Sequence, residues 1–464
     1  MSGFSRFVRR VNTSGYDYDI EHMQADKRQS TLTLSVVFLG WTVQFATIPV
    51  GGIIGLGLGF WDAVLAILIA EAILTGLSLT TGIIGRRVGL GFSMLSRYPF
   101  GHKGVFLPAV ASGVVMFGWL ALSVWIFANA FMGVAGLINE GWKTGGFFIG
   151  DFLAFILTIV PIVVGFQGPK WVGYISIPLF LVPMIYVMGR LIASAGGFAA
   201  ITAYHPPSPI PFAAAITLAI GAWVLGAVTC PDFTRMGRSD TAIIAPGVGL
   251  LIGESLVLIL GALTAAATGG KTWNPIEASA SLGGGAMVAV LILYMAAMWC
   301  TYVPTAWAAG MHFAAAFNRP KTIFAVALSI LAPLVAVLVQ YSVGALVWIS
   351  NFLTILSSVI PPIAGILVAE YYFVRKRQLP GITGFRRLVN PTAYIAWAIA
   401  GAVNYWTNSS LNAAGPGAGL KYGIPGLNGF VLAIVVYVIV EAAAKAMNLS
   451  WTSLQEVDEP HGSR

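Results

Sequence analysis

Three polar side chains stand inside long apolar segments of this 464-residue chain: Gln44, Glu71 and Glu254. A buried amide can hydrogen-bond to the polar edge of a ligand, or it can cap a broken backbone. A carboxyl group in an apolar span is rare and usually functional. Glu71 and Glu254 are therefore candidates for carrying a proton, with a polar network between helices as the alternative reading.

The segment around Gln44 predicts an interrupted helix. Residues 31–58 are apolar and long enough to span a membrane, but Pro49 and the pair Gly51-Gly52 break them midway. Lipid offers no hydrogen bonds to a broken backbone, so such a break survives only beside a cavity or inside packed protein. Secondary transporters build their substrate and ion sites from helices of this kind. Transport is therefore the first functional hypothesis.

Two tryptophans could complete a binding site. The indole faces of Trp119 and Trp223 can stack on a flat heterocycle, although most tryptophans in membrane proteins lie at interfaces or only pack. Ser123 lies one turn after Trp119 on the same helix face, where a serine either contacts a ligand or bonds to its own backbone.

A further cluster falls within residues 295–305, where small and hydroxyl side chains recur at helical spacing. A carbonyl, a thiol and a hydroxyl could converge there, and sodium prefers hard oxygen ligands such as carbonyls freed at a helix break. The alternative is a threonine bonded to its own helix. The residues concerned are Ala297, Cys300 and Thr301.

The composition predicts an all-α membrane protein. Hydrophobic residues make up 58% of the chain and charged residues only 9%, which is too apolar for a soluble protein of this length. The two cysteines lie in apolar stretches, so neither a disulfide framework nor a zinc site is expected. The five histidines are scattered, so an enzyme is not expected either, and no cofactor. A net charge of +8 belongs to the loops and does not indicate nucleic-acid binding.

Hydropathy and the breaks at glycine, proline and charge clusters predict twelve spans. All but four of the 25 basic residues then lie on one side of the membrane, which places both termini in the cytoplasm and indicates an inner or plasma membrane location. The predicted spans are 31–58, 61–85, 104–136, 148–166, 171–194, 210–231, 242–268, 284–316, 322–341, 345–374, 390–408 and 427–447.

An internal repeat is expected because Glu71 and Glu254 occupy similar apolar contexts in the second and seventh spans. Two halves of five spans each must be inverted relative to one another, since five is odd. The predicted organisation is a tail at 1–30, a first repeat at 31–194, a second repeat at 195–375, two further helices within 376–447 and a tail at 448–464.

Four segments resemble the nucleobase–cation symporter-1 family: IGRRVGL at 84–90, LSRYPFGHKG at 95–104, PDFTRMGR at 231–238 and IPPIAGILVAEYY at 360–372. The resemblance extends over about residues 30 to 380. It implies an amino-acid-transporter-type core with discontinuous helices 1 and 6, a site between these helices and helices 3 and 8, and alternating access. It also implies substrate contacts at Gln44, Phe45, Trp119, Ser123, Trp223 and Tyr302.

The resemblance implies a sodium site as well, from the Gly40 and Val43 carbonyls together with Ala297, Cys300 and Thr301. Cys300 departs from the family pattern, because a hydroxyl is expected there and thiol sulfur is a poor ligand for sodium. Glu71 and Glu254 replace asparagines of the family. Proton coupling through a glutamate is therefore an alternative to sodium coupling.

The sequence thus predicts a cation-coupled importer of a flat nitrogen heterocycle, such as cytosine or a purine, that acts as a monomer in the bilayer. A hydantoin-like or allantoin-like cyclic amide is the alternative substrate. An amino-acid carrier of the same fold is the runner-up among transporters, and a passive channel is the rival outside that class.

Overall fold

The computed structural model describes residues 22–23, 25–164, 167–280, 284–342, 345–381, 387–407 and 425–452. The regular secondary structure of these residues is helical apart from an isolated β-bridge between Gln29 and Gly237. Nine helices of the described part are long and apolar enough to cross a membrane, and two shorter apolar helices accompany them. The chain is therefore a multi-pass helical membrane protein, as its composition predicts.

The long helices agree with the predicted spans to within a few residues at most ends. They are α4 (Phe60–Val88), α7 (Phe106–Ile138), α8 (Lys143–Val164), α9 (Gln167–Ser194), α11 (Phe212–Val228), α14 (Ser255–Ala267), α16 (Gly284–Phe317), α17 (Lys321–Ser342), α18 (Ala345–Val368), α19 (Pro391–Thr407) and α20 (Pro425–Ala446). Short helices join them: η1 (Ala25–Lys27), α5 (Phe92–Leu95), α6 (Arg97–Phe100), η3 (Glu140–Trp142), α10 (Phe198–Thr202), α15 (Pro275–Ala280) and η8 (Ser450–Thr452).

The first predicted span is interrupted beside Gln44, as expected. α2 (Thr31–Thr42) is capped by Val43, and η2 (Phe45–Thr47) leads into α3 (Ile48–Gly57). Pro49 lies in the first turn of α3, where a missing N–H has no cost. The break therefore surrounds Gln44 and precedes Pro49, which corrects the prediction that the proline and the glycine pair cause it.

The glycines of α3 serve close packing. A Cβ atom on Gly51 would lie 2.0 Å from the carbonyl oxygen of Leu258, and one on Gly55 would lie 2.6 Å from the Cα of Ala262. α3 and α14 therefore cross with their backbones in contact, which only small residues allow.

A second interruption follows α11. The helix ends at Val228, and a single turn, α12 (Pro231–Thr234), begins three residues later at a proline. The seventh predicted span is built from η4 (Asp240–Ile244), α13 (Ala245–Val248), the π-helix η5 (Gly249–Glu254) and α14. Glu254 ends the π-helical segment, a feature that is rare and often found at functional sites.

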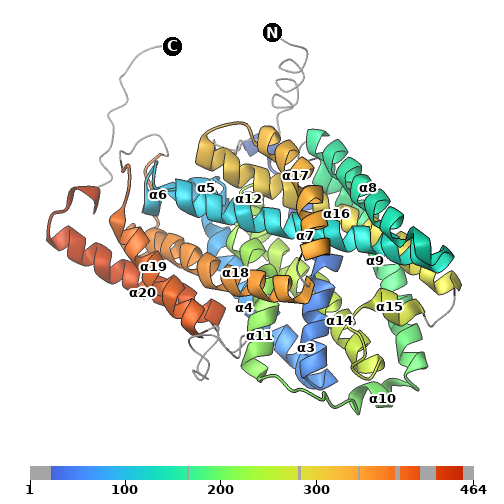
Figure 1. Cartoon of the computed structure of the whole chain (residues 1–464). Coiled ribbons are helices and arrows are strands. Elements are labelled where there is room, and N and C mark those ends of the chain that lie inside the picture. The colour runs from blue at the N-terminus through green and yellow to red at the C-terminus, as the bar shows by residue number, and fades with distance from the viewer. Residues whose placement is uncertain are drawn as a thin grey trace, which may run out of the picture.

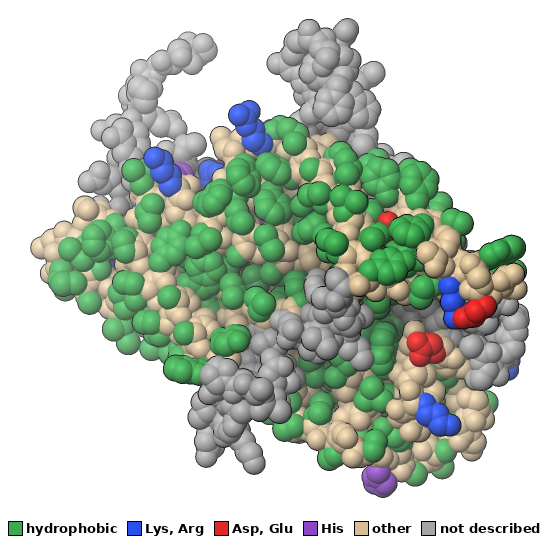
Figure 2. All heavy atoms as spheres, viewed as in Figure 1, with side chains coloured by type: hydrophobic (Ala, Val, Ile, Leu, Met, Phe, Trp, Pro, Cys, Tyr) green, Lys and Arg blue, Asp and Glu red, His purple; other side chains and the backbone are tan. Residues whose placement is uncertain are grey.

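Most of the helices pack in pairs around the centre of the molecule, and α19 and α20 form a separate flank. α3 packs on α14 and α4 on α11, while α7 packs on α8 and α16. α19 and α20 lie together at one side of the molecule and pack on α18 (Figure 1). Hydrophobic side chains cover most of the face seen in Figure 2, and charged ones are few. Such a surface suits contact with lipid.

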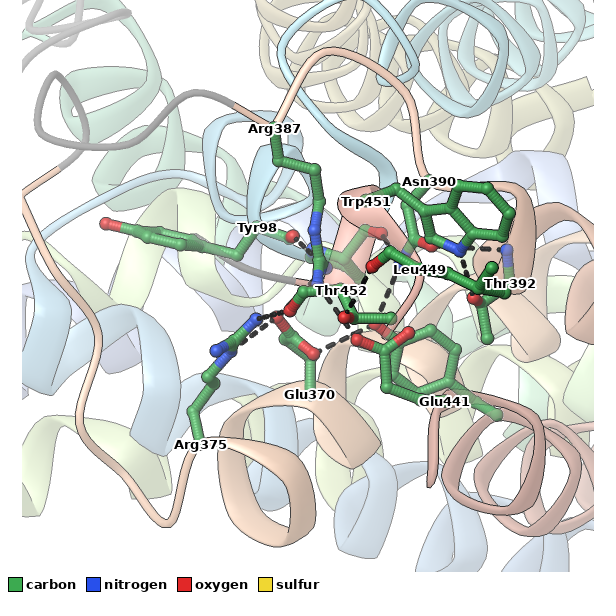
Figure 3. A network of polar contacts seen from close by, with 12 residues as sticks. Tyr98, Glu370, Arg375, Arg387, Asn390, Thr392, Glu441, Leu449, Trp451 and Thr452 are labelled. Carbon is green, nitrogen blue, oxygen red and sulfur yellow. Dashed lines mark hydrogen bonds and ion pairs between the residues drawn. The ribbon is translucent and has the colours of Figure 1, made fainter. Parts of the chain in front are cut away.

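A buried ionic network anchors the flank (Figure 3). Glu370 lies in the π-helix η6 (Ala369–Val374), which continues α18. Its Oε1 is 3.3 Å from Nη1 of Arg387, and its Oε2 accepts a hydrogen bond of 2.9 Å from the hydroxyl of Tyr437 on α20. Nη2 of Arg387 is 2.9 Å from Oε1 of Glu441, also on α20. The segment before α19 is thereby tied to both neighbouring helices.

We expect Arg387→Ala to destabilise the protein by about 3–5 kcal/mol, because the buried Glu441 loses its ion-pair partner and Glu370 keeps only Arg375. Thermal melting in detergent measures the loss, and Lys103→Ala, at an exposed position, is the control. Equal melting temperatures for Arg387→Ala and Lys103→Ala would contradict the anchoring role of the network.

Candidate functional site

A narrow cavity lies where the break between α2 and α3 meets α7, α11 and α16. Its volume is about 20 Å³, which is room for about one water molecule, so the wall must open before a heterocycle can enter. Its lining residues are Trp41, Gln44, Met116, Trp119, Ala222, Trp223, Leu225, Gly226 and Thr305.

The two tryptophans singled out in the sequence both line this cavity, from different helices. Trp119 comes from α7 and packs edge-on against Phe352, with ring centroids 5.5 Å apart. Trp223 comes from α11 and packs edge-on against Trp41 at 4.7 Å. Each indole is held by an aromatic neighbour, so its orientation is set before any ligand binds.

Gln44 also lines the cavity and follows directly on the end of α2. Its backbone N–H donates to the carbonyl oxygen of Thr42 at 2.8 Å, and not to that of Gly40, the partner in a regular helix. The Gln44 side chain is buried among the residues that surround the break. The side chain of Phe45, also a predicted contact, lies outside the described residues.

Ser123 and Tyr302 lie next to each other but not among the residues that line the cavity. The hydroxyl of Tyr302 donates to the backbone carbonyl of Ser123 at 2.8 Å, and its ring packs against Phe127. The hydroxyl of Ser123 is buried and makes no hydrogen bond within the described part of the chain. The role of both residues in recognising a substrate stays a prediction.

Sequence reasoning missed an aromatic, a thioether and a hydroxyl side chain of the wall, which are Trp41, Met116 and Thr305. The indole N–H of Trp41 donates to the hydroxyl of Thr305 at 3.4 Å, which joins α2 to α16 across the cavity wall. Helical spacing was the available signal. Trp41 precedes Gln44 by three positions and Met116 precedes Trp119 by three, so each pair shares a face.

The predicted cation ligands are only partly described. Gly40 and Val43 lie at the end of α2, where the missing helical bond leaves the Gly40 carbonyl without its regular partner. Thr301 is buried on α16. Ala297 and Cys300 belong to the same helix, but their side chains lie outside the described residues. Among the described residues, no group of three or more His, Cys, Asp or Glu side chains could hold a metal ion.

Glu71 on α4 and Glu254 at the end of η5 are both fully buried. No carboxyl oxygen of either residue makes a hydrogen bond within the described ranges. Glu254 faces the hydroxyl of Thr47 at the helix break and the indole N–H of Trp223, and the two glutamates interact electrostatically. The carboxyl group of Glu254 therefore lies behind Trp223, whose ring lines the cavity.

A family model described as "Permease for cytosine/purines, uracil, thiamine, allantoin" matches residues 23–424. The cytosine permease of Escherichia coli (strain K12) is 28% identical over 385 residues, which cover 82% of this chain and 86% of that protein. The hydantoin permease of Microbacterium maritypicum is 22% identical over 432 residues, which cover 87% of this chain and 86% of that protein.

Two solved structures are similar in fold. One is Mhp1, a nucleobase-cation-symport-1 family transporter, in a closed conformation with bromovinylhydantoin bound. It has a TM-score of 0.78 at 19% identity, over 93% of this chain and 97% of that chain. An inward-facing conformation of Mhp1 has a TM-score of 0.76 at 17% identity, over 93% and 94% of the two chains.

We expect Gly226→Ala to disturb the cavity wall, because a Cβ atom there would lie 1.9 Å from Cζ3 of Trp223. The indole must leave its position, and overpacking of this kind costs about 1–3 kcal/mol. Thermal melting and tryptophan fluorescence measure the change. Gly76→Ala is the matched control on α4, since a Cβ atom there meets nothing within 4 Å. If both variants melt alike with the wild-type emission spectrum, Trp223 does not rest on Gly226.

Proposed function

Because the chain belongs to the family of permeases for cytosine/purines, uracil, thiamine and allantoin, we propose that it is a secondary-active symporter that imports a planar nitrogen heterocycle with a cation. The substrate is a nucleobase such as cytosine or a purine. The observation that carries this proposal is the cavity at the helix break, with Trp119, Trp223 and Gln44 in its wall. Membership in a family of permeases also confirms the prediction that the chain is a transporter and not an enzyme.

The chemistry of the wall suits a flat ring. Aromatic stacking of a base is worth about 1–3 kcal/mol per side chain and tolerates different bases, because every base has a π-face. Gln44 can donate to and accept from an amide edge, which nucleobases and cyclic amides share. Ser123, Tyr302 and Phe45 are proposed as further contacts in a substrate-bound state. A hydantoin-like or allantoin-like amide is the second candidate, favoured by the similarity to a hydantoin permease.

The coupled cation has two proposed sites. Gly40, Val43, Ala297, Cys300 and Thr301 would supply oxygens to sodium beside the helix break. Glu71 and Glu254 would instead carry a proton. In either case the cation must bind the outward-facing, substrate-loaded state more tightly than the other states of the carrier. The gradient of that cation then drives import, because binding of the cation and of the substrate are linked.

We propose that twelve transmembrane helices build this carrier as two inverted repeats of five, at 31–194 and 195–375, with two further helices within 376–447. The fold similarity to Mhp1 supports such an arrangement. The tails at 1–30 and 448–464 would both be cytoplasmic, in an inner or plasma membrane, because the basic residues lie on that side. The unit that works would be the monomer.

We expect Trp119→Ala and Gln44→Ala each to raise the KM for uptake of a labelled heterocycle about tenfold or more, through lost stacking and hydrogen bonding. Cells or proteoliposomes given a panel of nucleobases, hydantoin and allantoin provide the measurement. Trp61→Ala is the matched control, because that indole is 59% exposed on the outer surface. Unchanged uptake in both site variants would place the substrate elsewhere.

Counterflow in proteoliposomes tests the carrier mechanism itself. We expect unlabelled substrate inside the vesicles to drive transient uptake of labelled substrate, because a carrier exchanges one molecule for another. A channel only equilibrates the label. Absence of counterflow for every heterocycle of the panel, together with exchange of amino acids, would favour the amino-acid carrier instead.

A further inference from the structure

Glu71 and Glu254 lie on packed helices inside the protein, near enough to interact electrostatically. α4 packs against both η5 and α14, and this packing brings the middle of the second span next to the π-helical part of the seventh. Both side chains are 0% exposed and interact electrostatically with each other. Neither carboxyl group makes a hydrogen bond within the residues that the structure describes.

Among the described residues, no ion pair or hydrogen bond from a cation reaches either carboxyl group. The sequences of α2, α3, α10, α11, α13, α14 and α18, which pack on α4 or η5, contain no Asp, Glu, His, Lys, Arg, Cys or Tyr. The titratable groups on or beside the other packed elements are Asp62, Arg86 and Arg87 of α4, Cys230, Asp232 and Arg235 at α12, and Asp240 of η4. Nε of Arg235 donates to the backbone carbonyl of Asp232.

These other groups are distant or engaged. Along α4, Asp62 lies about 13 Å from Glu71, and Arg86 about 22 Å from it, at the helical rise per residue. Asp232 accepts a hydrogen bond of 2.8 Å from the backbone of Phe92. Oδ1 of Asp240 lies 3.6 Å from Nε of Arg86.

As long as the pair stays buried, the two carboxyl groups cannot both be ionised, because burial and mutual repulsion both oppose the second charge; the proton can leave only when a conformational change opens the pair to water. One proton removes one charge and allows one carboxyl to donate to the other. We propose that Glu71 and Glu254 share a single proton and that this proton is the cation coupled to transport. The proposal rests on the proposed function and names its coupling ion.

The pair is connected to the substrate cavity through two side chains. The indole N–H of Trp223 faces Glu254 and makes no hydrogen bond in the described structure, while its ring lines the cavity. The hydroxyl of Thr47 faces Glu254 as well and donates to the backbone carbonyl of Gln44 at 3.3 Å. A hydroxyl has one proton, so Thr47 donates either to Gln44 or to an ionised Glu254.

The state of the carboxyl pair therefore alters both the indole and the helix break. In the cycle, one proton from the outer solution binds a carboxylate oxygen of the pair, and the heterocycle stacks on Trp223. After the change to the inward-facing state both are released, so that one positive charge enters with each neutral substrate molecule. No covalent bond is made or broken apart from O–H.

The test uses purified full-length protein in proteoliposomes and a labelled heterocycle that exchanges in counterflow. We expect an inward proton gradient to drive its accumulation without sodium, and substrate addition to alkalinise a weakly buffered outer solution. In Glu71→Gln and Glu254→Gln, the ratio of gradient-driven accumulation to exchange should fall about tenfold or more. Asp62→Asn, an exposed carboxyl of the same helix, should keep the wild-type ratio.

Accumulation that follows a sodium gradient at equal pH, without proton uptake, would overturn the proposal while leaving the proposed function intact. Wild-type proton uptake in Glu254→Gln would overturn it too. If a variant does not fold, proton uptake by the wild-type protein still shows whether the coupled ion is a proton. Infrared difference spectra give a second readout, because the carbonyl band of a protonated, buried carboxyl should be lost in both variants. If no heterocycle exchanges at all, the proposed function itself fails.

Discussion

Backbone groups that an interrupted helix leaves unpaired must find partners inside the protein, because lipid supplies none. This requirement organises the centre of the molecule. The chain between α2 and α3 is enclosed by α7, α14 and α16, and the backbone of α3 touches that of α14 at Gly51 and Gly55. The same enclosure creates the cavity, since the wall that protects the break also presents Gln44 and two indoles to its interior.

The aromatic wall shows how a rigid site arises from contacts that have nothing to do with the ligand. Trp223 is held between the ring of Trp41 and the bare backbone of Gly226. Trp119 is held by Phe352. Large side chains that already occupy one orientation lose little side-chain entropy when a flat molecule binds against them.

Buried carboxyl groups of this protein have two different kinds of surroundings. Around Glu370 every charge has a partner of opposite sign, and the network fastens α19 and α20 to α18. Around Glu71 and Glu254 no described partner of opposite sign exists. A satisfied network favours one arrangement, whereas an unsatisfied pair makes the free energy depend on protons, substrate and conformation. The first suits a fixed flank and the second suits moving parts.

Hydropathy and helix-breaking residues were sufficient to place the long helices, such as Phe60–Val88 for the predicted 61–85, because these signals are local. The types of Trp119, Trp223 and Gln44 likewise indicated stacking and hydrogen bonding. The exact break at Val43, the position of Trp41 in the wall and the proximity of Glu71 to Glu254 were decided only by the tertiary structure. Each depends on how far a helix is rotated and where it crosses its neighbour, and a single span carries no record of either.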